Sequence, residues 1–145
     1  MACPYFVPRE IVYDIAWPHP ARLPLGAGWT GSCCASDPNP DASATVLVDP
    51  NYVRDFCNLG YALACPRLPA ARDWDAIRFS VAGSSAEQIT FLFVCEKDHA
   101  PIAHGTMTYD LAGEAWRDPH PDSRVRRLAA SYLHAYRVRQ RSPLI

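Results

Sequence analysis

The fold is decided by the stretch Gln88-Ile89-Thr90-Phe91-Leu92-Phe93-Val94-Cys95-Glu96. Its aromatic and β-branched residues favour an extended strand. Because successive side chains of a strand point to opposite faces, the stretch presents two rows of side chains. One row is Ile89, Phe91, Phe93 and Cys95, and the other is Thr90, Leu92 and Val94. Both rows are largely apolar, so we expect a central strand with both faces covered.

The flanking segments are expected to complete a small antiparallel sheet. Residues 75–82 are also rich in strand-forming side chains. After the central strand, Lys97-Asp98-His99-Ala100 can turn the chain. Residues 101–109 would then return as an antiparallel hairpin partner.

A helical pattern begins near Asp122. Apolar residues recur there at helical spacing, namely Val125, Leu128, Ala129, Tyr132, Leu133 and Tyr136. This spacing predicts an amphipathic helix that runs to about Arg139. Its apolar side can cover one face of the sheet.

Prolines punctuate the first half of the chain, where ten of the fourteen lie within the first 70 residues. Each proline fixes φ and removes a backbone donor, so we expect a loop-rich wrap with little regular structure. One short helix is predicted from Asp49 to Gly60, with Pro50 at its first position. Cys57 would then lie in the last turn of this helix.

Together these patterns predict one α+β domain over residues 1–145. Residues 71–145 form a scaffold made of a small antiparallel sheet with a C-terminal helix. Residues 1–70 form a Pro-rich, loop-rich N-terminal half that carries a cysteine site. A chain of 145 residues can bury a core without help from disulfides.

The charge balance limits the classes of partner. The net charge is −1 and the isoelectric point is near 6.5, which argues against nucleic-acid binding because that needs a basic surface. The C-terminal segment is nevertheless locally basic, with Arg124, Arg126, Arg127, Arg137, Arg139 and Arg141. This pattern is typical of a solvated helix face, and the alternative is a surface for an acidic partner protein.

The sequence predicts a cytoplasmic location. Residues 1–10 contain neither a basic n-region nor an apolar h-region. No stretch approaches the ~18 consecutive apolar residues that a membrane span needs. We therefore expect a soluble protein without a membrane anchor.

The cysteines are the main functional lead. Most of them lie in turn-forming contexts: Cys3 and Cys65 precede prolines, Cys33 and Cys34 follow Gly31-Ser32, and Cys57 precedes Asn58-Leu59-Gly60. In the cytoplasm such thiols stay reduced, so this clustering favours a metal site over disulfides. Cys95 differs because it ends an apolar strand row, and we expect it to pack in the core.

An iron–sulfur cluster is the first interpretation of these thiols. Such clusters are usually held by four cysteine thiolates, and the predicted ligands are Cys3, Cys33, Cys57 and Cys65. A 4Fe–4S cluster is favoured, and its function would be electron transfer with a redox partner, or redox sensing. Only one of two adjacent residues normally points at a given centre, so Cys34 is the alternative to Cys33.

Zinc is the second interpretation. Structural zinc ligands commonly come in close pairs, whereas here the intervals between the predicted ligands are 29, 23 and 7 residues. A mixed site that uses His19 is an alternative, since imidazole also suits zinc. A structural zinc would make the chain a binding module acting through its arginine-rich helix. A third alternative has no metal, with the thiols simply buried in a core.

Three segments resemble those of an uncharacterised family of small Cys-rich bacterial proteins. They are Cys3-Pro4-Tyr5-Phe6-Val7-Pro8, residues 17–26 and residues 56–62. The resemblance covers roughly the first half of the chain and implies no reaction. The sequence also contains no recognisable nucleotide-binding loop or common hydrolase motif, so it does not decide whether the protein is an enzyme.

Overall fold

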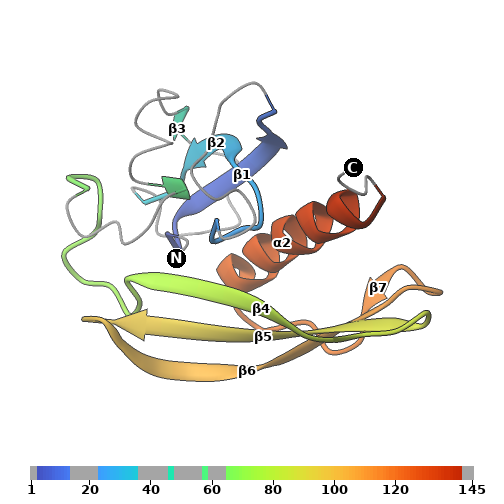
Figure 1. Cartoon of the computed structure of the whole chain (residues 1–145). Helices are drawn as coiled ribbons and strands as arrows, with labels where there is room; N and C mark the ends of the chain where they lie inside the picture. The colour runs from blue at the N-terminus through green and yellow to red at the C-terminus, as the bar shows by residue number, and fades with distance from the viewer. Residues whose placement is uncertain (1–2, 14–22, 36–45, 48–56, 59–64, 142–145) are drawn as a thin grey trace.

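The structure is a computed structural model in which residues 3–13, 23–35, 46–47, 57–58 and 65–141 are described. Within them the chain forms two antiparallel sheets and one C-terminal helix (Figure 1). The predicted α+β class is confirmed. No helix in this part of the chain is both long and apolar enough to cross a membrane.

The larger sheet has the strand order β4-β5-β6-β7. Its strands are β4 (Ala76–Ser84), β5 (Gln88–Lys97), β6 (Ala100–Asp110) and β7 (Ala115–Trp116), and all its pairings are antiparallel. The predicted central strand is β5, which lies between β4 and β6. The predicted turn is also confirmed, because Asp98 and His99 have φ values of 51° and 62°. Two positive φ values in succession are typical of a tight two-residue hairpin turn.

The described residues cover only one face of the larger sheet, so the expectation that both faces of β5 are buried is wrong. Phe91, Phe93 and Cys95 are buried on one face, whereas Leu92 on the other is 43% exposed. Figure 1 shows the reason: the helix and the smaller sheet lie on the same side of the larger sheet. No described segment remains to cover the opposite side.

The helix α2 (Ser123–Arg141) confirms the predicted amphipathic segment. Asp122 caps it, because its Oδ1 accepts a hydrogen bond from the main-chain N–H of Arg124 at 2.8 Å. Val125 and Leu128 are fully buried against the sheet. The helix therefore supplies the covering layer that the apolar spacing predicted.

The smaller sheet was not predicted. It consists of β1 (Phe6–Ile11), β2 (Trp29–Cys33) and β3 (Val46–Leu47) in the order β1-β2-β3. The expectation of little regular structure in this half is therefore wrong for these segments. Pro8 is tolerated because β1 is an edge strand, where a missing N–H need not break a ladder. The predicted helix from Asp49 to Gly60 lies outside the described residues, apart from positions 57 and 58.

A shared core joins the two halves of the chain. Phe6 and Trp29 of the smaller sheet belong to the same buried cluster as Ile77 of β4 and Leu128 of α2. Cys3 and Cys57 are members of this cluster, together with Cys95. The cysteine site is thus built onto the core of the scaffold.

Candidate cysteine metal site

The structure brings the four predicted ligands into one region. Cys3 and Cys57 are buried within the shared core, and Cys33 and Cys65 pack against it while partly exposed. All six cysteines lie among the described residues, and none of these forms a disulfide. Cys3, Cys33 and Cys57 come from segments that are remote in the sequence, whereas Cys65 follows Cys57 by eight positions.

The thiols lie within electrostatic range of one another. Burial raises the pKa of Cys3 to about 12, and Cys57, Cys33 and Cys65 each add to that rise. Burial also raises the pKa of Cys57 to about 12, with further contributions from Cys33 and Cys65. Like charges raise a thiol pKa only when they are close. Cys3, Cys33, Cys57 and Cys65 are here called the cysteine group.

Strand pairing fixes the position of Cys33 relative to Cys3. Cys33 ends β2 and pairs with Phe6, the first residue of β1. The main-chain N–H of Phe6 donates to the carbonyl of Cys3 at 3.1 Å, which closes a turn immediately before β1. Cys3 is therefore held next to the end of the strand that carries Cys33.

A buried amide holds Cys57 near the same strand. The neighbouring Asn58 is only 2% exposed. Its Oδ1 accepts from the main-chain N–H of Trp29 at 2.9 Å, and its Nδ2 donates to the Trp29 carbonyl at 2.9 Å. The sequence indicated only that Asn58 is part of a turn. The one available signal was its position directly after a predicted ligand.

Cys65 opens a turn on the exposed side of the group. The main-chain N–H of Leu68 donates to the carbonyl of Cys65 at 3.2 Å. Within this turn, Arg67 lies close enough to Cys57 to lower the pKa of that thiol, against the larger effects of burial and of the neighbouring thiols. The turn thus brings a positive charge towards the cysteine group.

The sulfur of Cys33 accepts a hydrogen bond from the main chain. The N–H of Ala35 donates to the Sγ of Cys33 at 3.4 Å. A backbone hydrogen bond from Tyr5 lowers the pKa of Cys3 against the dominant effect of burial. Donors directed at sulfur favour the thiolate, and they are among the features that set the potential of iron–sulfur sites.

Cys34 points away from the cysteine group. Its Sγ lies 3.6 Å from Nη2 of Arg127 on α2. Burial raises the pKa of Cys34, Arg127 lowers it, and Cys33 is the only other thiol that acts on it. Adjacent residues at a strand end point in opposite directions. This geometry favours Cys33 over Cys34 as the ligand.

Cys95 lies on the larger sheet and was expected to pack in the core. Cys95 is fully buried on β5, and burial raises its pKa to about 11, with smaller effects from Asp122, Arg124 and Asp73 but none from another cysteine. This agrees with the expected packing role. His19, the alternative zinc ligand, lies outside the described residues.

The thiols of the cysteine group are too far apart to bind one metal ion together. Across the residues that the structure describes, no three Cys, His, Asp or Glu side chains are grouped closely enough to hold one metal ion. A tetrahedral zinc with Zn–S bonds of about 2.3 Å requires sulfur atoms roughly 3.8 Å apart. A cluster of several iron atoms holds its thiolates around a larger centre.

A buried arginine, Arg124, lies in the first turn of α2. Arg124 donates to Asp73 at 3.1 and 3.0 Å and to Asp122 at 2.8 Å. Its guanidinium also covers the ring of Trp74, 4.3 Å from the centroid. Burial by itself would lower the pKa of Arg124, but the two carboxylates raise it above its ordinary value. The arginine is a fixed positive charge inside the fold.

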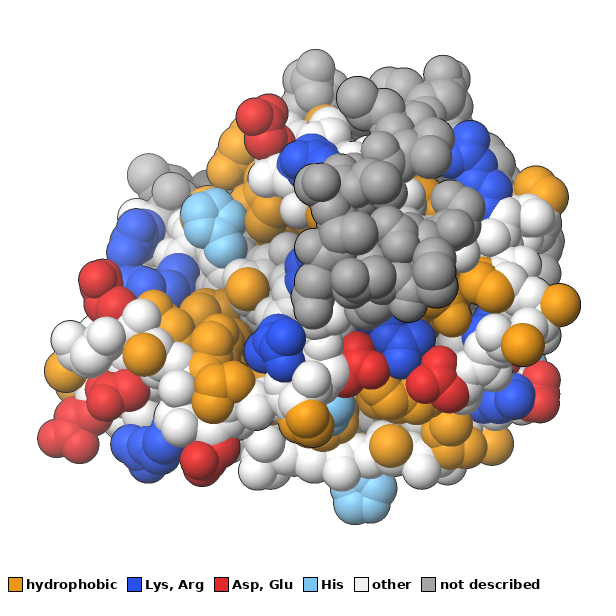
Figure 2. All heavy atoms as spheres, turned by 180° about the vertical axis from the view of Figure 1, so that it is seen from behind, with side chains coloured by type: hydrophobic (Ala, Val, Ile, Leu, Met, Phe, Trp, Pro, Cys, Tyr) orange, Lys and Arg blue, Asp and Glu red, His pale blue; other side chains and the backbone are white. Residues whose placement is uncertain are grey.

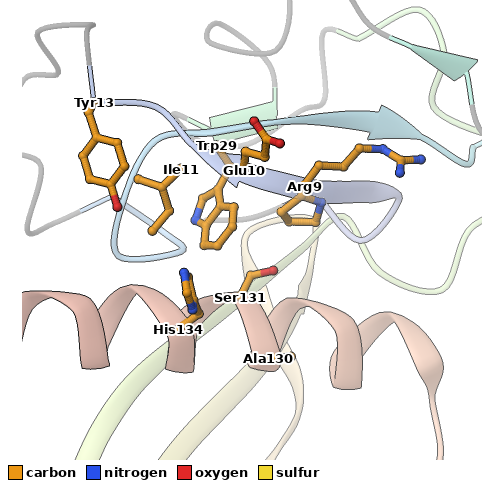
Figure 3. A pocket seen from close by; sticks show the side chains of 9 residues that line it. Arg9, Glu10, Ile11, Tyr13, Trp29, Ala130, Ser131 and His134 are labelled. Carbon is orange, nitrogen blue, oxygen red and sulfur yellow. The ribbon is translucent and has the colours of Figure 1, made fainter.

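A separate groove lies between β1 and α2 (Figure 3). It encloses about 660 Å³, with Tyr13 and Ile11 on the strand side and Ser131 and His134 on the helix side. The rings of Trp29 and His134 face each other across it, 5.9 Å apart. The Ser131 hydroxyl donates to the Arg127 carbonyl at 3.3 Å. It is therefore not directed at His134 as a nucleophile would be.

The exposed charges on one face are mixed in sign. Figure 2 shows acidic and basic side chains interspersed over the surface seen from behind. On α2, the last turn carries Arg139 and Arg141. They are two of the six arginines, from Arg124 to Arg141, that were expected to form a solvated face or a surface for an acidic partner, and Arg124 among these six is buried.

The described residues form an α+β protein in which Cys3 and Cys57 lie within the core and Cys33 and Cys65 pack against it. Compared with protein-family models, with curated proteins and with solved structures, the chain gives no match.

Proposed function

We propose that Cys3, Cys33, Cys57 and Cys65 hold an iron–sulfur cluster, and that the protein transfers single electrons or senses redox state through it. The observation that supports this function is that Cys3 and Cys57 lie in one buried cluster and that Cys33 and Cys65 pack against it. Reduced thiols at such a site suit a cytoplasmic protein. A redox protein would then be its partner.

The arrangement suits electron transfer better than catalysis at iron. Four thiolates would occupy every protein-facing position of a 4Fe–4S cluster, which leaves no iron open to a substrate. Burial of Cys3 and Cys57 keeps water away from the centre, and the N–H of Ala35 donates to the sulfur of Cys33. Burial and hydrogen bonds to sulfur are two of the factors that tune the reduction potential of a cluster.

A structural zinc is the second candidate for the same thiols. In that case the metal would stabilise the N-terminal half, and the basic end of α2 would bind an acidic partner protein. The arginines in the last helical turn support this alternative. A zinc site would also require the four sulfur atoms to move closer together than a cluster does.

Anaerobic purification followed by metal analysis tests the proposal. A protein that holds an iron–sulfur cluster should be brown, with visible absorption and with iron and acid-labile sulfide in equal amounts. Zinc is d¹⁰ and gives a colourless protein. A colourless preparation with stoichiometric zinc would reject the cluster and support the second candidate. Protein that binds neither metal after anaerobic reconstitution would reject both.

A further inference from the structure

Arg124 is held in one position by four groups. Asp73 and Asp122 bind its guanidinium, and Trp74 stacks under it, as described above. The side chain is 9% exposed. A planar guanidinium bound in this way has little freedom to move.

The fourth group is Tyr5, whose ring centroid lies 5.6 Å from Cζ of Arg124. The main chain of Tyr5 lies beside the segments that carry Cys3 and Cys33. Its carbonyl accepts from the N–H of Cys34, the neighbour of Cys33, at 2.9 Å, and Tyr5 lies within the turn that the N–H of Phe6 closes onto the carbonyl of Cys3 at 3.1 Å. Tyr5 therefore links the buried arginine to a predicted ligand.

We infer that Arg124 is a positioning residue for the cysteine group: it fixes the ring of Tyr5, and Tyr5 in turn fixes the turn that carries Cys3. The inference rests on the proposed function, because it takes Cys3 as a ligand. Its geometry does not depend on which metal is bound. The start of α2 thus controls a ligand that lies more than a hundred residues earlier in the chain.

The test measures the position of Cys3 in metal-free protein, so that it does not require a cluster. Each thiol is alkylated with iodoacetamide under reducing, native conditions, and the rates at Cys3 and Cys57 are compared by peptide mass spectrometry. Modification of a protected thiol reports how often its surroundings open. Cys57 serves as the internal reference, since global unfolding exposes both thiols equally.

Arg124→Gln and Tyr5→Ala should each raise the Cys3 to Cys57 rate ratio about tenfold, which corresponds to about 1.4 kcal/mol of local opening. The double variant should show no further rise, because both changes remove the same link. Arg126→Gln is the matched control. Arg126 lies on the same helix but donates to the carbonyls of His120 and Pro121 at 2.7 and 2.9 Å, so the ratio should not change.

Three results would overturn the inference. They are an equal rise at Cys3 and Cys57, additive effects of Arg124→Gln and Tyr5→Ala, and a ratio in Arg126→Gln as high as in Arg124→Gln. If Arg124→Gln does not fold, Arg124→Lys keeps the charge and loses the planar contacts, and it should still raise the ratio. Wild-type protein that binds no metal, together with a raised ratio in the variants, would reject the proposed function but not the positioning role.

Discussion

Asn58 and Trp29 are joined by a pair of hydrogen bonds in which a side-chain amide pairs with a main chain. Both bonds are 2.9 Å long and both are buried. The amide thereby does what a neighbouring strand residue would do at the start of β2. Because Asn58 follows Cys57, this pair connects a predicted ligand to the smaller sheet.

Asn58→Ala should destabilise the protein by about 2–4 kcal/mol, because it leaves the Trp29 N–H and carbonyl buried without partners. Urea denaturation measures this change. Metal content should fall in the same variant, since Cys57 loses its anchor. Thr30→Ala is the control on the same strand, because the Thr30 hydroxyl bond to Glu10 is exposed and its loss should cost less than about 0.5 kcal/mol. Equal losses at the two positions would contradict the structural role of the amide.

Gly31 is predicted to be intolerant of any side chain. A Cβ at this position would meet the carbonyl oxygen of Val7 and lie 2.6 Å from the Phe6 ring. The strand pairing of β1 and β2 prevents the oxygen from moving away, so Gly31→Ala should cost about 1–3 kcal/mol or more. Gly83→Ala is the matched control, because a Cβ there meets nothing within 4 Å. Thermal unfolding of the two variants should differ clearly, and similar melting temperatures would refute the steric argument.

The larger sheet and α2 could be predicted because their signals are local. The alternation around Phe91 and the helical spacing around Leu128 each lie within one element, and both elements form as expected. The exposure of Leu92 could not be predicted. An apolar row shows that a face can be buried, but only the arrangement of distant segments decides whether anything covers it.

The cysteine group was only partly visible in the sequence. Turn contexts pointed to Cys3 and Cys65, but they gave no information on what holds these residues in place. The supporting contacts are long-range: Asn58 binds a residue 29 positions away, and Arg124 binds one 51 positions away. The strand β1 was missed for a related reason, because Pro8 is read as a strand breaker unless the strand is known to lie at an edge.

Asp75 should make the stability of the protein sensitive to acid. It is 1% exposed and accepts from the main-chain N–H of Asp98 at 2.7 Å and from the Arg72 guanidinium. Burial by itself would raise the pKa of Asp75, but these donors together lower it below the ordinary 3.8. Its contribution is therefore fully present above pH 3.8 and is lost as the pH falls through the lower pKa of the folded protein.

Asp75→Asn removes the charge, so the variant should be less stable near neutral pH by about 2–3 kcal/mol. Its free energy of unfolding should then fall less than that of the wild type between about pH 6 and about pH 3. Asp73 and Asp122 also have lowered pKa values, so a smaller acid dependence should persist in the variant. Urea denaturation across this range measures both slopes, and parallel curves would show that Asp75 is not responsible.

Single cysteine substitutions should divide the six thiols into two classes. Cys57→Ser and Cys65→Ser should each remove most of the bound iron after anaerobic reconstitution, because each removes one of four ligands from a cooperative site. Cys34→Ser should retain the metal, since Cys34 faces Arg127 rather than the other thiols. Cys95→Ser should also retain it while costing about 1–3 kcal/mol, because a hydroxyl replaces a fully buried thiol. Iron and sulfide analysis shows which variants lose the metal, and urea denaturation measures the change in stability. Metal loss in Cys95→Ser equal to that in Cys57→Ser would mean that the ligand set is wrong. The charges that shift the pKa of Cys95 are those of Asp122, Arg124 and Asp73, and none of the four proposed ligands contributes.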